Sequence, residues 1–171
     1  MSINVKDKRK NGFADYNDTS TTTTPLVLSA GVWTTIPNDG LGAFTNLTNI
    51  PFGITQLMDV TTGYIDPTQL YIGDTILIRN DYTITPSVNN SLLKIRYELG
   101  TGAGLYQLET TVGRLDSGSG IGYRLALKPD LIYMGDSNTK DNYIKIQVNL
   151  ENDGTLENAG TVIQVVKGGV W

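Results

Sequence analysis

The sequence predicts an all-β protein, an antiparallel two-sheet sandwich of the jelly-roll type. Apolar and polar residues alternate in several short runs, as in strands with one buried face and one solvated face. Clusters of Gly, Asn and Asp separate these runs, and no 11-residue window carries an apolar stripe of helical period. Many short strands joined by such turns, without helices, are typical of a sandwich or jelly roll.

The first strand-like run begins at Pro25, and later runs lie at residues 75–82, 92–99, 105–112, 123–128, 143–150 and 161–167. In 92–99, Tyr97 shares the inward face with three aliphatic residues, Leu93, Ile95 and Leu99. In 143–150, the inward face carries Ile144, Ile146, Val148 and Leu150, so Tyr143 points outward with Lys145 and Gln147. The run at 105–112 is expected to turn Tyr106, Leu108 and Val112 inward. Glycines after Asp or Asn, as in "PNDG" and "ENDG", supply the turns.

Residues 1–24 differ in kind from the rest. They contain a basic cluster, then polar residues, then the stretch "TSTTTT", which has no apolar face to bury. Such a segment cannot offset its ordering entropy alone, so we expect an extended N-terminal arm over residues 1–24 and a jelly-roll domain over residues 25–171. Aromatic and basic residues within the arm suit binding to another protein surface. These residues are Lys6, Lys8, Arg9, Lys10, Phe13 and Tyr16.

Composition excludes several classes of function. The chain has no Cys and no His, which removes disulfides, thiolate zinc sites and histidine bases. Residues 1–24 carry a net charge of +1 and the remainder, with 9 basic and 14 acidic groups, carries −5. An acidic body repels nucleic acid and anionic membrane, so neither is expected as a partner. No apolar run is long enough for a membrane span, which predicts a soluble protein made in a cytoplasm.

No motif predicts catalysis, a metal or a cofactor. "GTGAGL" resembles half of a dinucleotide fingerprint, but a strand-like run follows it where a helix is required. "DSNTKDN" and "ENDGTLEN" offer oxygen ligands without the spacing of a calcium loop, so solvated turns are expected there. A hydrolase built on two carboxylates stays open as an alternative that the sequence does not locate.

Three stretches carry a resemblance to a known family. "TTTTPLVLSAGVWTTIPNDGLGAFTN", "GITQLMDVTTGYIDPTQLYIGDTILIRNDYTITP" and "YMGDSNTKDNYIKIQVNL" combine a Trp before an "NDG" turn, an aspartate-rich lead into a strand, and a late "DNY". Over about residues 20–166 the sequence resembles bacteriophage virion proteins with a tumour-necrosis-factor-like jelly roll, found as capsid decoration or head-fibre proteins.

The resemblance implies a structural, non-enzymatic homotrimer on the exterior of a phage capsid, with the arms bound to the major capsid protein. Three linked arms raise the effective concentration and strengthen attachment. The trimer contact is expected on one sheet face that includes Tyr97 and Tyr143. Deletion of residues 1–24 is expected to abolish capsid binding and leave the fold intact. The alternative is a receptor-binding tip whose loops, such as "SGSGIG" or "DSNTKDN", contact a host-surface glycan.

Overall fold

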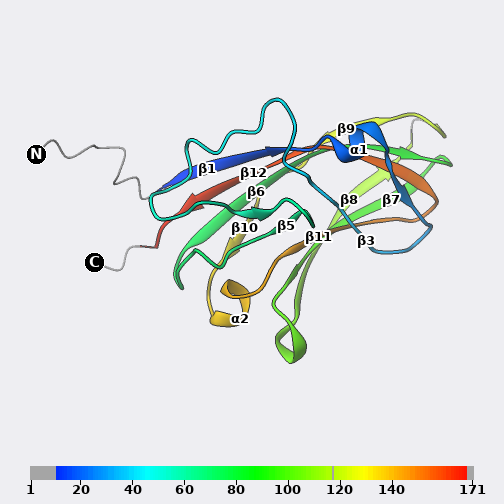
Figure 1. The fold of residues 1–171 in the computed structure, drawn as a ribbon. Helices are drawn as coiled ribbons and strands as arrows, with labels where there is room; N and C mark the ends of the chain where they lie inside the picture. The colour runs from blue at the N-terminus through cyan, green and yellow to red at the C-terminus, as the bar shows by residue number, and fades with distance from the viewer. Residues whose placement is uncertain (1–10, 117, 169–171) are drawn as a thin grey trace, which may run out of the picture.

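The computed structural model describes residues 11–116 and 118–168, and the chain forms an antiparallel β-sandwich of two main sheets (Figure 1). Sheet A runs in the order β1-β12-β6-β10, with β2 beside β12 and β9 beside β6. Its strands are β1 (Gly12–Asn17), β2 (Leu26–Leu28), β6 (Thr75–Pro86), β9 (Tyr123–Ala126), β10 (Asp130–Tyr133) and β12 (Gly154–Val166). The expected all-β jelly-roll sandwich is thereby confirmed.

Sheet B faces sheet A and runs in the order β3-β11-β7-β8. Its strands are β3 (Thr34–Thr35), β7 (Ser91–Leu99), β8 (Tyr106–Leu115) and β11 (Lys145–Leu150). A two-stranded ribbon of β4 (Met58–Asp59) and β5 (Tyr64–Ile65) joins sheet B through a bridge between Ile65 and Ile144. Short helical turns complete the chain: α1 (Ser20–Thr23), η2 (Gly102–Gly104) and α2 (Ser137–Lys140). None of the described helices is long and apolar enough to cross a membrane.

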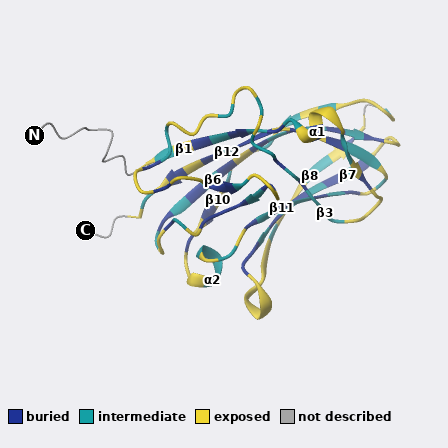
Figure 2. Cartoon of the chain, viewed as in Figure 1, coloured by how far each residue is buried: buried dark blue, intermediate teal, exposed yellow. Residues whose placement is uncertain are grey.

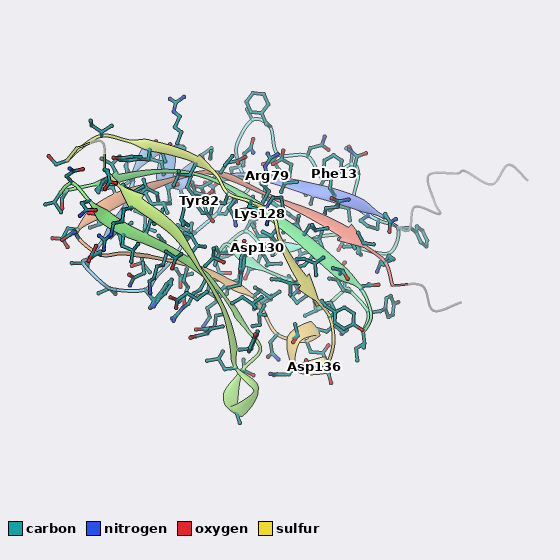
Figure 3. All side chains as sticks on the ribbon, turned by 180° about the vertical axis from the view of Figure 1, so that it is seen from behind. Phe13, Arg79, Tyr82, Lys128, Asp130 and Asp136 are labelled. Atoms are coloured by element: carbon teal, nitrogen blue, oxygen red, sulfur yellow. The ribbon has the colours of Figure 1, made fainter. Side chains whose placement is uncertain are left out.

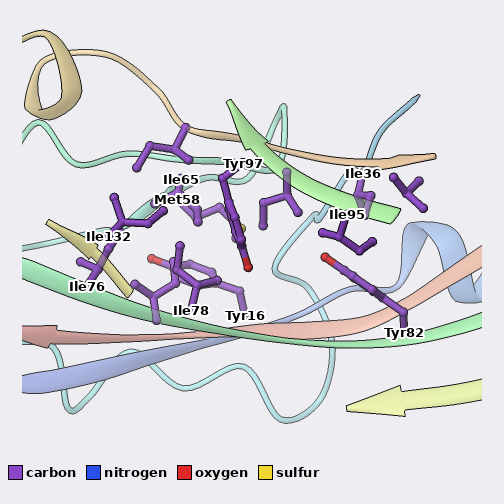
Figure 4. Packing of buried hydrophobic residues seen from close by; sticks show 14 of the residues in the cluster. Tyr16, Ile36, Met58, Ile65, Ile76, Ile78, Tyr82, Ile95, Tyr97 and Ile132 are labelled. Atoms are coloured by element: carbon purple, nitrogen blue, oxygen red, sulfur yellow. The ribbon is translucent and has the colours of Figure 1, made fainter. Parts of the chain in front are cut away.

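The core lies between the two sheets, and its residues follow the predicted alternation. All eight inward positions named above for residues 92–99 and 143–150 are buried (Figure 2). Sheet A contributes Ile76, Ile78, Tyr82 and Ile84 from β6, and Ile163 and Val165 from β12. Figure 4 shows Ile76, Ile78 and Tyr82 of β6 and Ile95 and Tyr97 of β7 between the two sheets.

The run at 105–112 behaves differently. Tyr106 is 61% exposed, and Leu108 and Val112 are only partly buried against the core. β8 is an edge strand, and its register with β7 shifts between Leu93 and Lys94, where Gly113 and Thr111 are the partners. The bulge lies at residues 111–113, so Tyr106 still pairs with buried Leu99 and keeps the inward parity. Tyr106 begins an edge strand and its ring is exposed there, so the buried position predicted for Tyr106 is wrong.

The predicted boundary at residue 24 is also wrong, because residues 12–23 belong to the sandwich. β1 pairs with β12 over its whole length, from Gly12 opposite Val165 to Asn17 opposite Gly160. Its other edge is covered by residues 42–49, through bonds such as Phe13 N to Asn49 O at 3.0 Å. Both edges of β1 are paired, so backbone hydrogen bonds order this segment despite its polar composition.

The threonine-rich stretch is ordered by side-chain hydrogen bonds within the chain. Thr21 is buried, donates from Oγ1 to Asp18 Oδ2 at 2.5 Å, and accepts from the backbone N of Asn158 at 2.7 Å. Asp39, in the "PNDG" turn, accepts from the backbone and hydroxyl of Thr19 at 2.9 and 2.6 Å. The sequence reasoning looked for an apolar face in this stretch, whereas polar contacts to distant residues hold it.

Candidate functional site

An apolar patch lies on the outer face of sheet A. The pairing register places Leu131 of β10, Leu77 of β6, Gln164 of β12 and Phe13 of β1 in one row across the sheet. In the next row, Thr75 of β6 is paired with Tyr133 of β10 on one side and with Val166 of β12 on the other. Leu131 is 60% exposed and Tyr133 is 57% exposed. We call the five large apolar residues the sheet A patch: Phe13, Leu77, Leu131, Tyr133 and Val166.

The sheet A patch lies at the end of the sandwich where the described chain begins and stops. β1 begins and β12 ends at this end (Figure 1). Asn11 Oδ1 accepts a hydrogen bond from the backbone N of Lys167 at 3.0 Å, which joins the first described residue to the one before the last. Lys167 also pairs with buried Asp74 at 3.0 Å and lies over the Tyr71 ring at 4.9 Å. Asn11, the first described residue, therefore lies at the patch end of the sandwich.

The residues predicted to anchor the chain fall into three groups. Lys6, Lys8, Arg9 and Lys10 lie outside the described residues. Phe13 lies on the outer face of β1 with 39% of its surface exposed, so it is available to a partner (Figure 3). Tyr16 is 1% exposed, and its hydroxyl accepts from the backbone N of Leu57 at 2.8 Å. The anchoring role of Tyr16 is wrong, because strand alternation turns its ring into the core.

The predicted trimer contact paired Tyr97 with Tyr143, and the structure separates these two residues. Tyr97 is 2% exposed and lies between the sheets (Figure 4), where its hydroxyl accepts from Asn80 Nδ2 at 2.8 Å. Burial raises the pKa of Tyr97 far above its usual value, in keeping with a neutral phenol in the core. The interface role of Tyr97 is wrong. Tyr143 is 46% exposed, as its outward parity predicted.

The outer face of sheet B is polar, and its side chains bind one another. Arg96 donates to Gln147 Oε1 at 2.8 Å and to Gln107 Oε1 at 3.2 Å, and its guanidinium lies 4.2 Å from the Trp33 ring centroid. Lys94 pairs with Glu109 at 2.8 Å. These contacts already satisfy the charged groups, so this face offers little apolar surface to a second subunit.

A cleft of about 350 Å³ opens at one end of sheet B. Its wall includes the loop 100–105 and six polar or aromatic residues: Tyr64, Glu98, Thr101, Asn142, Tyr143 and Lys145. Lys145 donates to Glu98 at 2.8 Å across paired strands, and this bond lowers the pKa of Glu98 and raises the pKa of Lys145. The Tyr64 and Tyr143 rings meet edge to face with centroids 6.3 Å apart.

In the oxygen-rich stretches "DSNTKDN" and "ENDGTLEN", carboxylates accept hydrogen bonds from the surrounding chain. Asp136 accepts from the backbone N of Thr139 at 2.7 Å and caps α2, and this bond lowers the pKa of its carboxyl. Glu151 accepts from the backbone N of Leu92 at 3.0 Å and from Arg114 at 2.8 Å. Among the described residues, no three carboxylates gather in a way that could hold a metal ion.

Sequence reasoning missed the sheet A patch, although a signal was present. In "TILIRNDY" both Leu77 and its neighbours Ile76 and Ile78 are apolar, and in "DLIY" two exposed apolar residues flank buried Ile132. Apolar residues at both the inward and the outward positions of a strand indicate that both faces of the sheet are covered by other surfaces. Only the register shows that the outward residues of separate strands form one row.

Comparison with known proteins gives matches to solved structures alone, since no family model and no curated protein matches the chain. A structure of the Gt strain of infectious bursal disease virus is 12% identical, with a TM-score of 0.46, over 100% of this chain and 38% of that chain. The T13 particle of the same virus gives 12% identity and a TM-score of 0.48 over 99% and 35%. Its VP2 subviral particle gives 14% identity and a TM-score of 0.45 over 99% and 37%.

The chain spans less than two fifths of the length of each of these viral chains. At these identities and TM-scores, neither the role nor the partners of the viral proteins transfer to this chain. The sandwich architecture rests on the strand pairing described above.

Proposed function

We propose that the chain is a structural virion protein that forms a homotrimer and attaches to the outside of a phage capsid. The sheet A patch carries this proposal. Leu131 and Tyr133 are exposed beside half-buried Leu77, and Phe13 and Val166 lie in the same two rows beyond Gln164 and Thr75. Exposed clusters of large apolar side chains mark protein interfaces. The resemblance to tumour-necrosis-factor-like virion proteins supplies the class of assembly and the trimeric state.

Self-association through sheet A places the contact on Leu77, Leu131, Tyr133 and Val166. These residues come from three adjacent strands of one sheet, so the backbone holds them in a fixed arrangement before a partner arrives. Apolar side chains on a backbone held by strand pairing lose little conformational entropy on association. Sheet B, whose outer charges are paired with one another, stays in contact with solvent.

Capsid attachment is assigned to the basic cluster Lys6, Lys8, Arg9 and Lys10, with Phe13 beside it at the margin of the patch. Residues 1–10 carry a net charge of +3 and the remainder of the chain carries −7. The basic segment therefore suits an acidic surface on the major capsid protein, whereas the acidic body is repelled by it. Three such segments on one trimer act together through effective concentration.

The solution mass of the full chain tests the trimer. Light scattering after size-exclusion chromatography is expected to give three times the 18.6 kDa chain mass. Leu131→Asp is expected to reduce the mass to that of one chain, because a carboxylate in the apolar row must lose its hydration on association. A matched change on sheet B, Thr111→Asp, is expected to leave the trimer intact. A wild-type monomer would overturn the homotrimer.

Capsid attachment is tested by co-sedimentation with phage heads that lack the protein. Removal of residues 1–10 is expected to abolish binding and to leave the trimer mass and the melting temperature unchanged. The structure excludes a larger truncation as a test, because removal of residues 1–24 also removes β1 from sheet A. Full binding by the chain that lacks residues 1–10 would contradict the anchoring role.

A further inference from the structure

We propose that the Tyr143 cleft, formed by Tyr64, Glu98, Thr101, Asn142, Tyr143 and Lys145, binds an uncharged saccharide. The site lies on sheet B and on the loop 100–105, away from the sheet A patch, and it does not depend on the virion role proposed above. Its ligand is the ring of a neutral sugar, either free or at the end of a surface glycan.

The first argument is the aromatic surface. Tyr143 is 46% exposed, although it directly precedes a buried residue, Ile144, that bridges to Ile65. The Tyr64 ring meets it edge to face at an interplanar angle of 62°, and both rings line the cleft. A half-exposed aromatic ring at the wall of a cleft offers a stacking surface to the C–H face of a sugar.

The second argument is the charge balance. Glu98 and Lys145 pair at 2.8 Å and cancel each other, so the cleft has no excess charge to select an ionic ligand. The second carboxylate oxygen of Glu98 accepts only a 3.4 Å bond from Gln107, and an ammonium group has three donors. The pair therefore presents both an acceptor and donors, and sugar hydroxyls can use both at once.

The third argument is rigidity. Asn138 of α2 donates to Gly104 O at 2.9 Å and accepts from the backbone N of Thr101 at 3.2 Å, so the loop that walls the cleft is tied to α2 (Figure 1). A Cβ on Gly100 or Gly104 would lie within 2.4 Å of Asn138 Nδ2, so the approach of Asn138 requires glycine at both positions. A braced wall of this kind lowers the entropic cost of binding.

Saturation-transfer NMR on the full chain tests the site with methyl α-glucoside, methyl β-galactoside and N-acetylglucosamine, and with N-acetylneuraminic acid as the anionic comparison. Transfer to ring protons of at least one neutral sugar is expected, with little transfer to the acid. Tyr143→Ala is expected to weaken neutral-sugar binding about tenfold or more, whereas Tyr143→Phe, which keeps the ring, retains it. Transfer to none of the neutral sugars, or equal transfer in Tyr143→Ala, overturns the proposal.

Two further pairs of variants test the charge preference of the cleft and distinguish sugar binding from subunit assembly. Glu98→Gln leaves Lys145 uncompensated and is expected to shift preference from the neutral sugars toward N-acetylneuraminic acid, whereas Glu109→Gln, on the same sheet face outside the cleft, leaves preference unchanged. Tyr133→Ala, in the sheet A patch, is expected to alter the solution mass and to retain sugar binding. Tyr143→Ala is expected to weaken sugar binding and to leave the solution mass unchanged. A changed mass in Tyr143→Ala would place Tyr143 in a subunit interface and overturn the sugar site.

Discussion

The two outer faces of the sandwich carry different chemistry on the same kind of scaffold. On sheet B, Arg96 and its neighbours from three strands bind one another across the face. On sheet A, the equivalent outward positions near the chain ends are Leu77, Leu131 and Tyr133. Cross-strand polar pairs stabilise a solvated face, whereas an unpaired apolar row is stabilised only when a partner covers it. This difference is the basis for the proposed assembly through sheet A, since the polar side chains of sheet B already bind one another.

The largest effect on stability is expected for a substitution on the inner face of β1. Tyr16→Ala removes a buried ring and the acceptor of the Leu57 N–H, so we expect a loss of about 3–5 kcal/mol in the free energy of unfolding. Phe13→Ala, on the outer face of the same strand, is the matched control and is expected to cost less than about 1 kcal/mol in a monomeric background such as Leu131→Asp. Urea denaturation measures both, and equal losses would contradict the assigned faces.

A change on the outer face of sheet A is expected to act on assembly more than on folding. The double variant Leu131→Ser and Tyr133→Ser removes most of the exposed apolar area while it leaves the inward residue Ile132 in place. We expect the trimer to dissociate at concentrations where the wild type stays assembled, as measured by sedimentation equilibrium. The melting temperature extrapolated to the monomer is expected to change little, and a large drop would instead mean a role in the fold.

On sheet B a smaller, folding-related effect is expected. Arg96→Met keeps the aliphatic stem but removes the bonds to Gln147 and Gln107 and the contact with Trp33. Exposed cation–π and polar contacts of this kind stabilise by about 0.5–1 kcal/mol, so a decrease of that size in unfolding free energy is expected, with no change in solution mass. Dissociation of the assembly by Arg96→Met would show that sheet B takes part in the interface.

The smallest effect concerns pH. The hydrogen bond from Lys145 holds the pKa of Glu98 below its ordinary value of 4.5, so the folded state prefers the ionised carboxylate. The resulting stability is present above pH 4.5 and is lost as the pH falls through the lowered pKa, by about 1 kcal/mol or less. Glu98→Gln is expected to flatten this part of the stability curve, measured by urea midpoints between about pH 5 and pH 2. Glu109→Gln serves as the comparison, and an unchanged slope in Glu98→Gln would contradict the linkage.

The sequence by itself determined the sandwich and much of its core. The alternation in residues 92–99 and 143–150 placed each inward side chain correctly, including Tyr97, and it also placed Tyr143 outside. Alternation succeeds there because neighbouring strands and one buried face impose a period of two on the backbone. The same reasoning held within β1, where inward Ala14 and Tyr16 are separated by outward Asp15, but the surrounding polar residues concealed that signal.

Only the tertiary structure decided which distant residues order the N-terminal segment and which residues of separate strands lie on one surface. Thr21 and Asp18 are ordered by contacts with Asn158 and the 37–40 turn, partners that lie far away in the sequence. The sheet A patch and the Tyr143 cleft likewise join residues from separate strands and loops. Local sequence encodes which way a side chain points on its own strand, whereas strand order and register determine its neighbours.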